Sequence, residues 1–137
     1  MITKTSPDKQ KSEALKKMAE ITLERLKETE IVKYPSNTLN DYYDVIHKLM
    51  EAITVSRGIK FKGDGAHQEL IDYISKMFSL EDQTRQFLQE MRDYRNRISY
   101  EGFMINKNYI VLNQEKIKKI IKTLQEIAKR WNLIKKT

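Results

Sequence analysis

The sequence lacks cysteine, and its 137 residues include only four glycines, two prolines and two histidines. Without cysteine there is no disulfide framework, no thiolate metal site and no cysteine nucleophile. Scarce glycine and proline favour long, uninterrupted elements. No stretch approaches the roughly 18 consecutive apolar residues of a membrane-spanning helix, and Met1–Thr5 lacks the apolar core of a signal peptide. We therefore expect a cytoplasmic protein without a membrane-spanning segment.

The composition is that of a folded chain, with 39% hydrophobic and 33% charged residues. The length predicts a single domain over residues 1–137. The formal net charge of +7 permits a polyanionic partner such as RNA. Much of the positive charge lies near the C-terminal end of the chain, on a helix face that is equally well explained by simple solvation.

Apolar residues at spacings of three and four predict an all-α, up-and-down bundle of about five helices. The first opens at Ser6-Pro7-Asp8 and fades near residues 28–30, the second covers about 38–57 and the third about 66–78. The fourth follows a capping arrangement over residues 79–82 and ends near Gly102, and the last is capped by Asn113. The last helix has the clearest apolar stripe: Ile117, Ile120, Ile121, Leu124, Ile127, Ala128, Trp131 and Ile134.

Two segments interrupt the helical pattern. Residues 58–65 carry three of the four glycines and predict a loop, which lacks the Gly-Lys-Ser/Thr ending of a phosphate-binding loop. Before the last helix, apolar residues 103–105 and 109–112 flank the turn-forming Asn106-Lys107-Asn108. This pattern predicts a small β-hairpin or an extended loop.

Generic catalytic motifs are missing. The two histidines, His47 and His67, have no partner at metal-ligand spacing, so we predict neither a metal site nor a cofactor. His47 lies one step from the apolar stripe of its helix, at its edge or exposed. His67 opens the third helix beside the glycine-rich loop, where it caps the helix or contacts a partner.

Arg95 is unusual because it lies on an apolar helix face. Around it, apolar residues recur at helical spacing: Phe87, Leu88, Met91, Tyr94 and Ile98. A guanidinium stays charged, and burying it without a partner is costly. Arg95 therefore binds an anionic ligand, pairs with an acid such as Glu90 or Asp93, or stacks on a tyrosine.

Residues 95–100, Arg-Asn-Arg-Ile-Ser-Tyr, resemble the signature of HEPN domains, which are small helical bundles of prokaryotes and of some larger eukaryotic proteins. That signature is an arginine, a polar residue, three further residues and a histidine, near the end of a late helix. Arg95 and Asn96 match its first two positions, and Tyr100 falls at the histidine position. The string continuing through Gly102 also looks like a form found in archaeal members. The resemblance implies a HEPN-like domain over nearly the whole chain.

In that family, the arginine and histidine of two protomers meet across a dimer interface and cleave RNA without a metal. Arginine holds the phosphate, and histidine moves the proton of the 2′-hydroxyl. Tyrosine is a poor base at pH 7. The resemblance thus implies a homodimer that binds RNA or a nucleotide at a dimer cleft, with ribonuclease activity lost or weak. The candidate catalytic residues are Arg95, Asn96 and Tyr100, and the candidate binding residues are Arg92, Arg97, Ser99 and His67.

Two alternatives remain open. The first is an active metal-independent endoribonuclease with Tyr100, or less directly His67, in place of the histidine. The second is an interaction module that pairs with a small nucleotidyltransferase, as in toxin-antitoxin systems; the tyrosine modified in such toxins corresponds to Gly102. On an ideal helix Arg95 and Tyr100 are about 140° apart. Either the helix ends near Ser99, or the two side chains serve opposite sides of a dimer interface.

Overall fold

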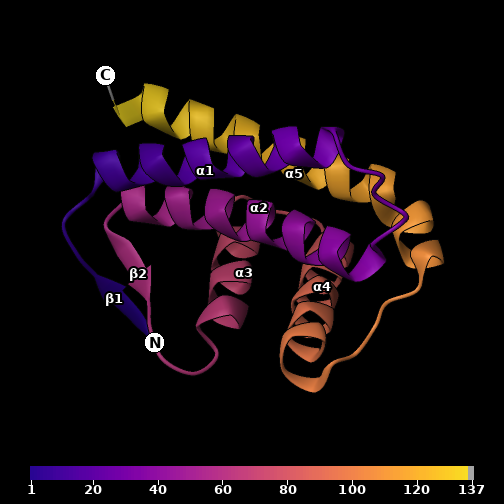
Figure 1. The fold of residues 1–137 in the computed structure, drawn as a ribbon. Helices are drawn as coiled ribbons and strands as arrows, with labels where there is room; N and C mark the ends of the chain where they lie inside the picture. Colours follow the sequence, from indigo (N-terminus) through magenta and orange to yellow (C-terminus); the bar gives the residue numbers. More distant parts are fainter. Residues whose placement is uncertain (136–137) are drawn as a thin grey trace.

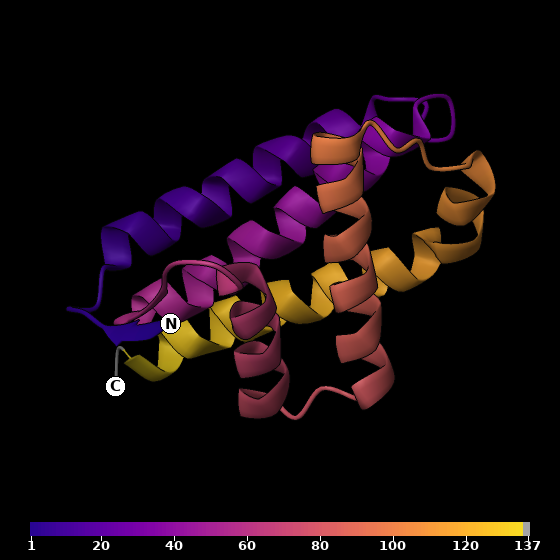
Figure 2. The same ribbon diagram turned by 90° about the horizontal axis from the view of Figure 1, so that it is seen from below.

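The computed structural model describes residues 1–135, with side chains described through residue 130. In chain order, the elements are β1 (Ile2–Lys4), α1 (Lys9–Lys27), α2 (Pro35–Ser56), β2 (Ile59–Phe61), α3 (Ala66–Met77), α4 (Asp82–Glu101) and α5 (Lys107–Lys135). Figures 1 and 2 show α1, α2 and α5 lying along one another, while the pair of α3 and α4 crosses them. The predicted all-α bundle of about five helices is confirmed. The small β element that accompanies it is formed by β1 and β2, not by the segment before the last helix.

Helix α2 is the centre of the fold. It packs against α1, α3, α4, α5 and β2. Such a position requires apolar residues around most of the helix, and Leu39, Ile46 and Met50 are all completely buried. Pro35 occupies the first helical turn, where its missing N–H is not needed. For this reason α2 begins before residue 38, the start expected from the apolar pattern.

Helix α5 begins at Lys107, which corrects the sequence prediction of an extended segment over residues 109–112 and of a cap at Asn113. The backbone N–H of Asn108 instead donates to the side chain of Asn106, at 2.8 Å. Ile110, Ile117 and Leu124 are spaced by one heptad and are completely buried, so a helix lets Ile110 extend the apolar stripe. Only residues 102–106 form the extended loop. Trp131 and Ile134, also predicted on this stripe, lie outside the described side chains.

The β element is formed by segments far apart in sequence. β1 pairs antiparallel with β2, with Thr3 opposite Lys60. Thus the glycine-rich region predicted as a loop contains a short strand, and the two strands are separated by α1 and α2. The sequence predicts that the first helix opens at Ser6, but α1 is capped two residues later, by Asp8. The carboxylate of Asp8 accepts the N–H of Lys11 at 2.9 Å.

Gly58 closes the junction between α2 and the strands. Its φ is +75°, a left-handed conformation that side chains rarely adopt. The backbone N–H of Thr5 donates to the carbonyl of Gly58 at 2.6 Å, and a Cβ at position 58 would clash with the carbonyl oxygen of Thr5. The fold therefore requires glycine here. Within residues 1–135, the structure contains no helix of the length and apolarity that crossing a membrane would require.

Candidate functional site

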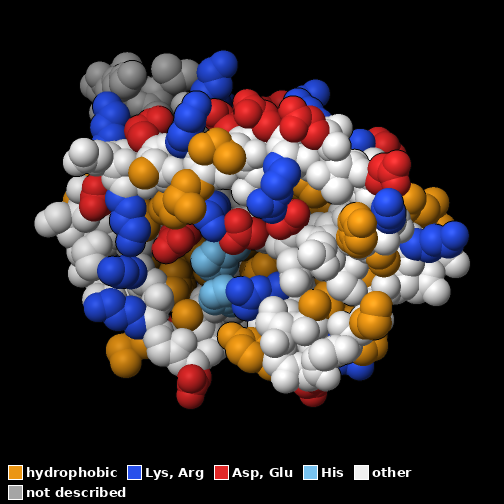
Figure 3. Space-filling model, viewed as in Figure 1, with side chains coloured by type: hydrophobic (Ala, Val, Ile, Leu, Met, Phe, Trp, Pro, Cys, Tyr) orange, Lys and Arg blue, Asp and Glu red, His pale blue; other side chains and the backbone are white. Residues whose placement is uncertain are grey.

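A small pocket of about 250 Å³ lies where α2, α3 and α4 meet. We call it the histidine pocket, and it is lined by Asn40, Asp41, Tyr43, Asp44, His47, His67, Arg95 and Ser99. Figure 3 shows both histidines, in pale blue, at the bottom of a hollow in the surface, with basic and acidic side chains at its edge. The hollow brings side chains from three separate helices to one place.

The two histidine rings stack on each other. Their centroids are 4.1 Å apart, with an angle of 26° between the ring planes. The hydroxyl of Tyr43 lies 3.5 Å from Nδ1 of His67, the outer limit of a hydrogen bond. Tyr43 is itself buried, one helical turn before His47 on α2. Tyr43 and His47 are thus the two residues of α2 whose rings lie beside His67 of α3.

Both imidazoles are neutral at pH 7. Burial, followed by the proximity of His67, lowers the pKa of His47 from the usual 6.5 to about 4, although Asp44 acts in the opposite direction. Burial, followed by the charges of Arg95 and Arg92, lowers the pKa of His67. A neutral imidazole keeps one nitrogen that accepts a proton or a hydrogen bond. The pocket therefore contains two such nitrogens beside two positive charges.

Arg95 has no carboxylate partner among the residues that the structure describes. Its one side-chain hydrogen bond runs from Nη1 to Oδ1 of Asn96, at 3.4 Å. Glu90, an acid expected as a possible partner, instead accepts the hydroxyl of Tyr109 at 2.7 Å. The half-buried guanidinium lines the histidine pocket without a neutralising acid. This arrangement favours an anionic ligand over a structural ion pair.

The acids of the pocket do not neutralise Arg95 because both already have partners. Asp41 pairs with Arg25 at 2.6 Å, and Asp44 pairs with Lys48 at 2.7 Å. In these ion pairs the carboxylates of Asp41 and Asp44 are neutralised by Arg25 and Lys48, not by Arg95. The local charge available to a ligand is consequently positive.

The structure separates the sequence-predicted site residues into two groups. Arg95, Ser99 and His67 line the histidine pocket, and Asn96 contacts Arg95. Arg92 donates to the side chain of Gln89 at 2.9 Å and lies close enough to influence His67. Arg92, Arg95 and Ser99 are three and four positions apart, so they share one face of α4.

Arg97 and Tyr100 lie away from the pocket. Arg97 pairs with Glu101 at 3.6 Å, and its guanidinium stacks 4.1 Å above the ring of Phe103. Tyr100 is 78% exposed. Helix α4 continues to Glu101, with Gly102 in the left-handed conformation at its end, so the idea that it ends near Ser99 is corrected. The unbroken helix keeps Arg95 and Tyr100 on different sides.

His47, Tyr43, Asn40 and Asp44 are residues of this site that the sequence prediction missed. A signal for them exists, because polar residues recur on α2 at spacings of four, three and four: Asn40, Asp44, His47 and Glu51. This polar stripe runs beside the apolar one, and it lines the histidine pocket and a second hollow of about 160 Å³ that contains Glu51. Polar residues at helical spacing within an otherwise buried helix indicate a cleft.

Across residues 1–135, no group of three or more histidine, cysteine, aspartate or glutamate side chains is arranged to hold a metal ion. No protein-family model matches the chain, and comparisons with curated proteins and with solved structures found no similar protein.

Proposed function

We propose that the chain is a HEPN-like domain whose histidine pocket binds the phosphate of RNA or of a nucleotide. The observation that carries the proposal is the Arg95 guanidinium, half-buried in the pocket and without a carboxylate partner among the described residues. A guanidinium binds two phosphate oxygens at once, and such charge-assisted hydrogen bonds are stronger than neutral ones.

The other groups of the pocket suit the same ligand. The imidazole N–H groups of His47 and His67 are donors for further phosphate or ribose oxygens, and Ser99 adds a hydroxyl. At about 250 Å³ the pocket is smaller than most small-molecule sites, which span roughly 300–1,000 Å³. It has room for one phosphate with part of its nucleoside, while the rest of an RNA strand continues over the surface.

Binding of a labelled single-stranded RNA and of AMP tests this proposal. Arg95→Gln weakens binding by about 10- to 100-fold, the range expected for the loss of a charged hydrogen-bond donor. Arg97→Gln is the matched control, because it removes the same charge from the same helix but outside the pocket. The RNA affinity falls steeply with salt. If both variants lost the same affinity for RNA and AMP, binding would reflect only nonspecific attraction to a basic protein. That result would contradict a phosphate site in the histidine pocket.

A second candidate function is metal-independent cleavage of RNA, favoured by the position of His67 and His47 beside Arg95. One neutral imidazole takes the proton of the ribose 2′-hydroxyl, and the 2′-oxygen attacks phosphorus. Arg95 stabilises the charge that develops on the phosphoryl oxygens. The 5′-oxygen leaves and takes up a proton from the imidazolium or from water. The products are a 2′,3′-cyclic phosphate and a 5′-hydroxyl.

Incubation of RNA with the protein in EDTA distinguishes cleavage from binding. If the pocket is catalytic, cyclic-phosphate products form with the unchanged protein and with Arg97→Gln, and they are lost with Arg95→Gln and with His67→Asn. Binding that depends on Arg95, without cleavage, supports the first proposal alone. Pairing with a small nucleotidyltransferase stays a prediction.

The proposed domain acts as a homodimer. At the junction of α4 and α5, large apolar side chains are left exposed: Tyr100 at 78%, Met104 at 82% and Leu112 at 80%. Exposed apolar surface of this kind supports packing of a second chain. Tyr100 then contributes to the interface between the two chains rather than to proton transfer.

A further inference from the structure

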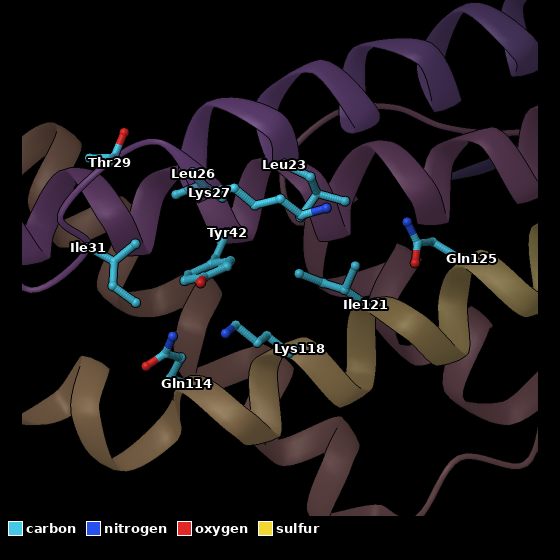
Figure 4. A pocket seen from close by; sticks show the side chains of 10 residues that line it. All are labelled: Leu23, Leu26, Lys27, Thr29, Ile31, Tyr42, Gln114, Lys118, Ile121 and Gln125. Carbon is cyan, nitrogen blue, oxygen red and sulfur yellow. The ribbon is translucent and has the colours of Figure 1, made fainter.

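A further pocket, separate from the histidine pocket and from the 160 Å³ hollow, lies between α1 and α5 over the side of α2. We call it the α1–α5 groove, and it has a volume of about 510 Å³. Figure 4 shows the side chains that line it: Leu23, Leu26, Lys27, Thr29, Ile31, Tyr42, Gln114, Lys118, Ile121 and Gln125. Its volume is typical of sites for small organic ligands.

The floor of the groove is apolar. Leu23 and Leu26 come from α1, Ile31 from the connection to α2, and Ile121 from α5. Leu26 and Ile121 belong to the buried core, and Leu23 and Ile31 are partly buried against it. Because Leu26 and Ile121 are already buried, an apolar body laid along this floor would remove from water the hydrocarbon surface that Leu23 and Ile31 still expose.

The hydroxyl of Tyr42 is the most informative polar group in the groove. Tyr42 is only 3% exposed as a whole residue, and none of the hydrogen bonds within the described part of the chain involves its hydroxyl. Figure 4 places the Tyr42 ring between the side chains of α1 and α5, with its oxygen directed to the side of Gln114 and Lys118. The hydroxyl is not one of the buried atoms that lack a partner, so it opens onto the groove, where it can donate to a ligand in place of water.

The groove is positively charged at its edges. Lys27 reaches it from α1 and Lys118 from α5, and neither ammonium forms an ion pair with any described carboxylate. The lining contains no aspartate or glutamate, although Glu115 lies near enough to influence Tyr42. Two ammonium groups and one hydroxyl donor above an apolar floor match a ligand that has a single anionic head and an apolar body.

We infer that the α1–α5 groove binds an amphiphile with one carboxylate head, such as a fatty acid, with Tyr42 and Lys118 holding the carboxylate. The apolar body lies against Leu23 and Ile31. This site is separate from the proposed phosphate site, since no residue lines both pockets.

Titration calorimetry with dodecanoate tests the inference, with dodecan-1-ol as the uncharged comparison. Dodecanoate binds with one-to-one stoichiometry, and dodecan-1-ol binds at least about tenfold more weakly. Tyr42→Phe, which removes only an unpaired hydroxyl and leaves the core filled, weakens dodecanoate binding by about tenfold. Lys118→Gln weakens it by about three- to fivefold.

The controls separate this groove from other surfaces. Lys122→Gln removes a neighbouring charge of α5 outside the groove, and Tyr73→Phe removes a tyrosine hydroxyl on α3; both variants bind dodecanoate like the unchanged protein. Arg95→Gln also leaves dodecanoate binding unchanged, which distinguishes the groove from the histidine pocket. The inference is overturned by any of three results: no saturable binding, equal binding of the alcohol, or equal losses for Lys118→Gln and Lys122→Gln.

Discussion

The imidazole rings of His47 and His67 stack at a centroid distance of 4.1 Å, although one belongs to α2 and the other to α3. The hydroxyl of Tyr43 and the guanidinium of Arg95 complete the same pocket. This arrangement lowers the pKa of both imidazoles. Burial removes His47 and His67 from solvent, and His67 also lies near the positive charges of Arg95 and Arg92. Measurable consequences follow for stability and for ionisation.

Stability falls in mild acid because of His47. Its pKa in the folded protein is about 4, compared with the usual 6.5, so the unfolded chain binds more protons between these values. The contribution of neutral His47 to the free energy of unfolding is fully present above pH 6.5. It is lost as the pH falls toward 4, by an amount on the order of 2–3 kcal/mol. Urea unfolding at pH 7, 6, 5 and 4 measures this loss. His47→Asn flattens the profile, and an unchanged slope in that variant would contradict the assignment.

The ionisation of His67 responds to Arg95. Because the positive charge of Arg95 lowers the pKa of His67, Arg95→Gln raises that pKa. Titration of the imidazole signals by NMR measures the shift. Arg97→Gln is the matched control and leaves the pKa of His67 unchanged, since Arg97 pairs with Glu101 and stacks on Phe103. If both variants moved the pKa equally, the effect would come from net charge and not from the pocket.

Gly58→Ala destabilises the fold more than Gly63→Ala. Both glycines have positive φ, so each substitution carries a backbone cost of about 1 kcal/mol. The space around Gly63 is open, whereas a Cβ on Gly58 would clash with the carbonyl oxygen of Thr5. In urea unfolding, we expect the free energy of unfolding to fall by about 1 kcal/mol for Gly63→Ala and by about 2–4 kcal/mol for Gly58→Ala. Equal losses would mean that the junction with β1 adds nothing to stability.

The proposed homodimer is tested by light scattering at micromolar concentration, where the protein should have twice the mass of one chain. Leu112→Glu places a charge on the exposed apolar surface at the start of α5 and should produce the monomer. Met18→Glu, at a 51% exposed position on α1, is the control and should stay dimeric. A monomeric unchanged protein would exclude a cleft shared by two chains, and the histidine pocket would then act within a single chain.

The sequence by itself indicated five helices, although not where α2 and α5 begin, and it marked Gly102 as the residue near which α4 ends. Apolar residues at spacings of three and four indicate the buried face of a helix, because a helix has about 3.6 residues per turn. A helix is readable from sequence since its hydrogen bonds link residues that are near one another in the chain. Gly102 marked the end of α4 for a local reason as well, because glycine adopts the left-handed conformation found there. Arg95 was recognisable because its charge contradicts the apolar pattern around it.

Only the tertiary structure decided which distant residues meet. The pairing of β1 with β2 depends on α1 and α2 lying antiparallel, and no local pattern marks three-residue strands. Residues 109–112 have strand-like composition, yet burial of Ile110 on the core makes them helical. His47 and His67 have no sequence relationship at ligand spacing. Packing of α3 against α2 brings them together beside Arg95, and the unbroken α4 turns Tyr100 away from them.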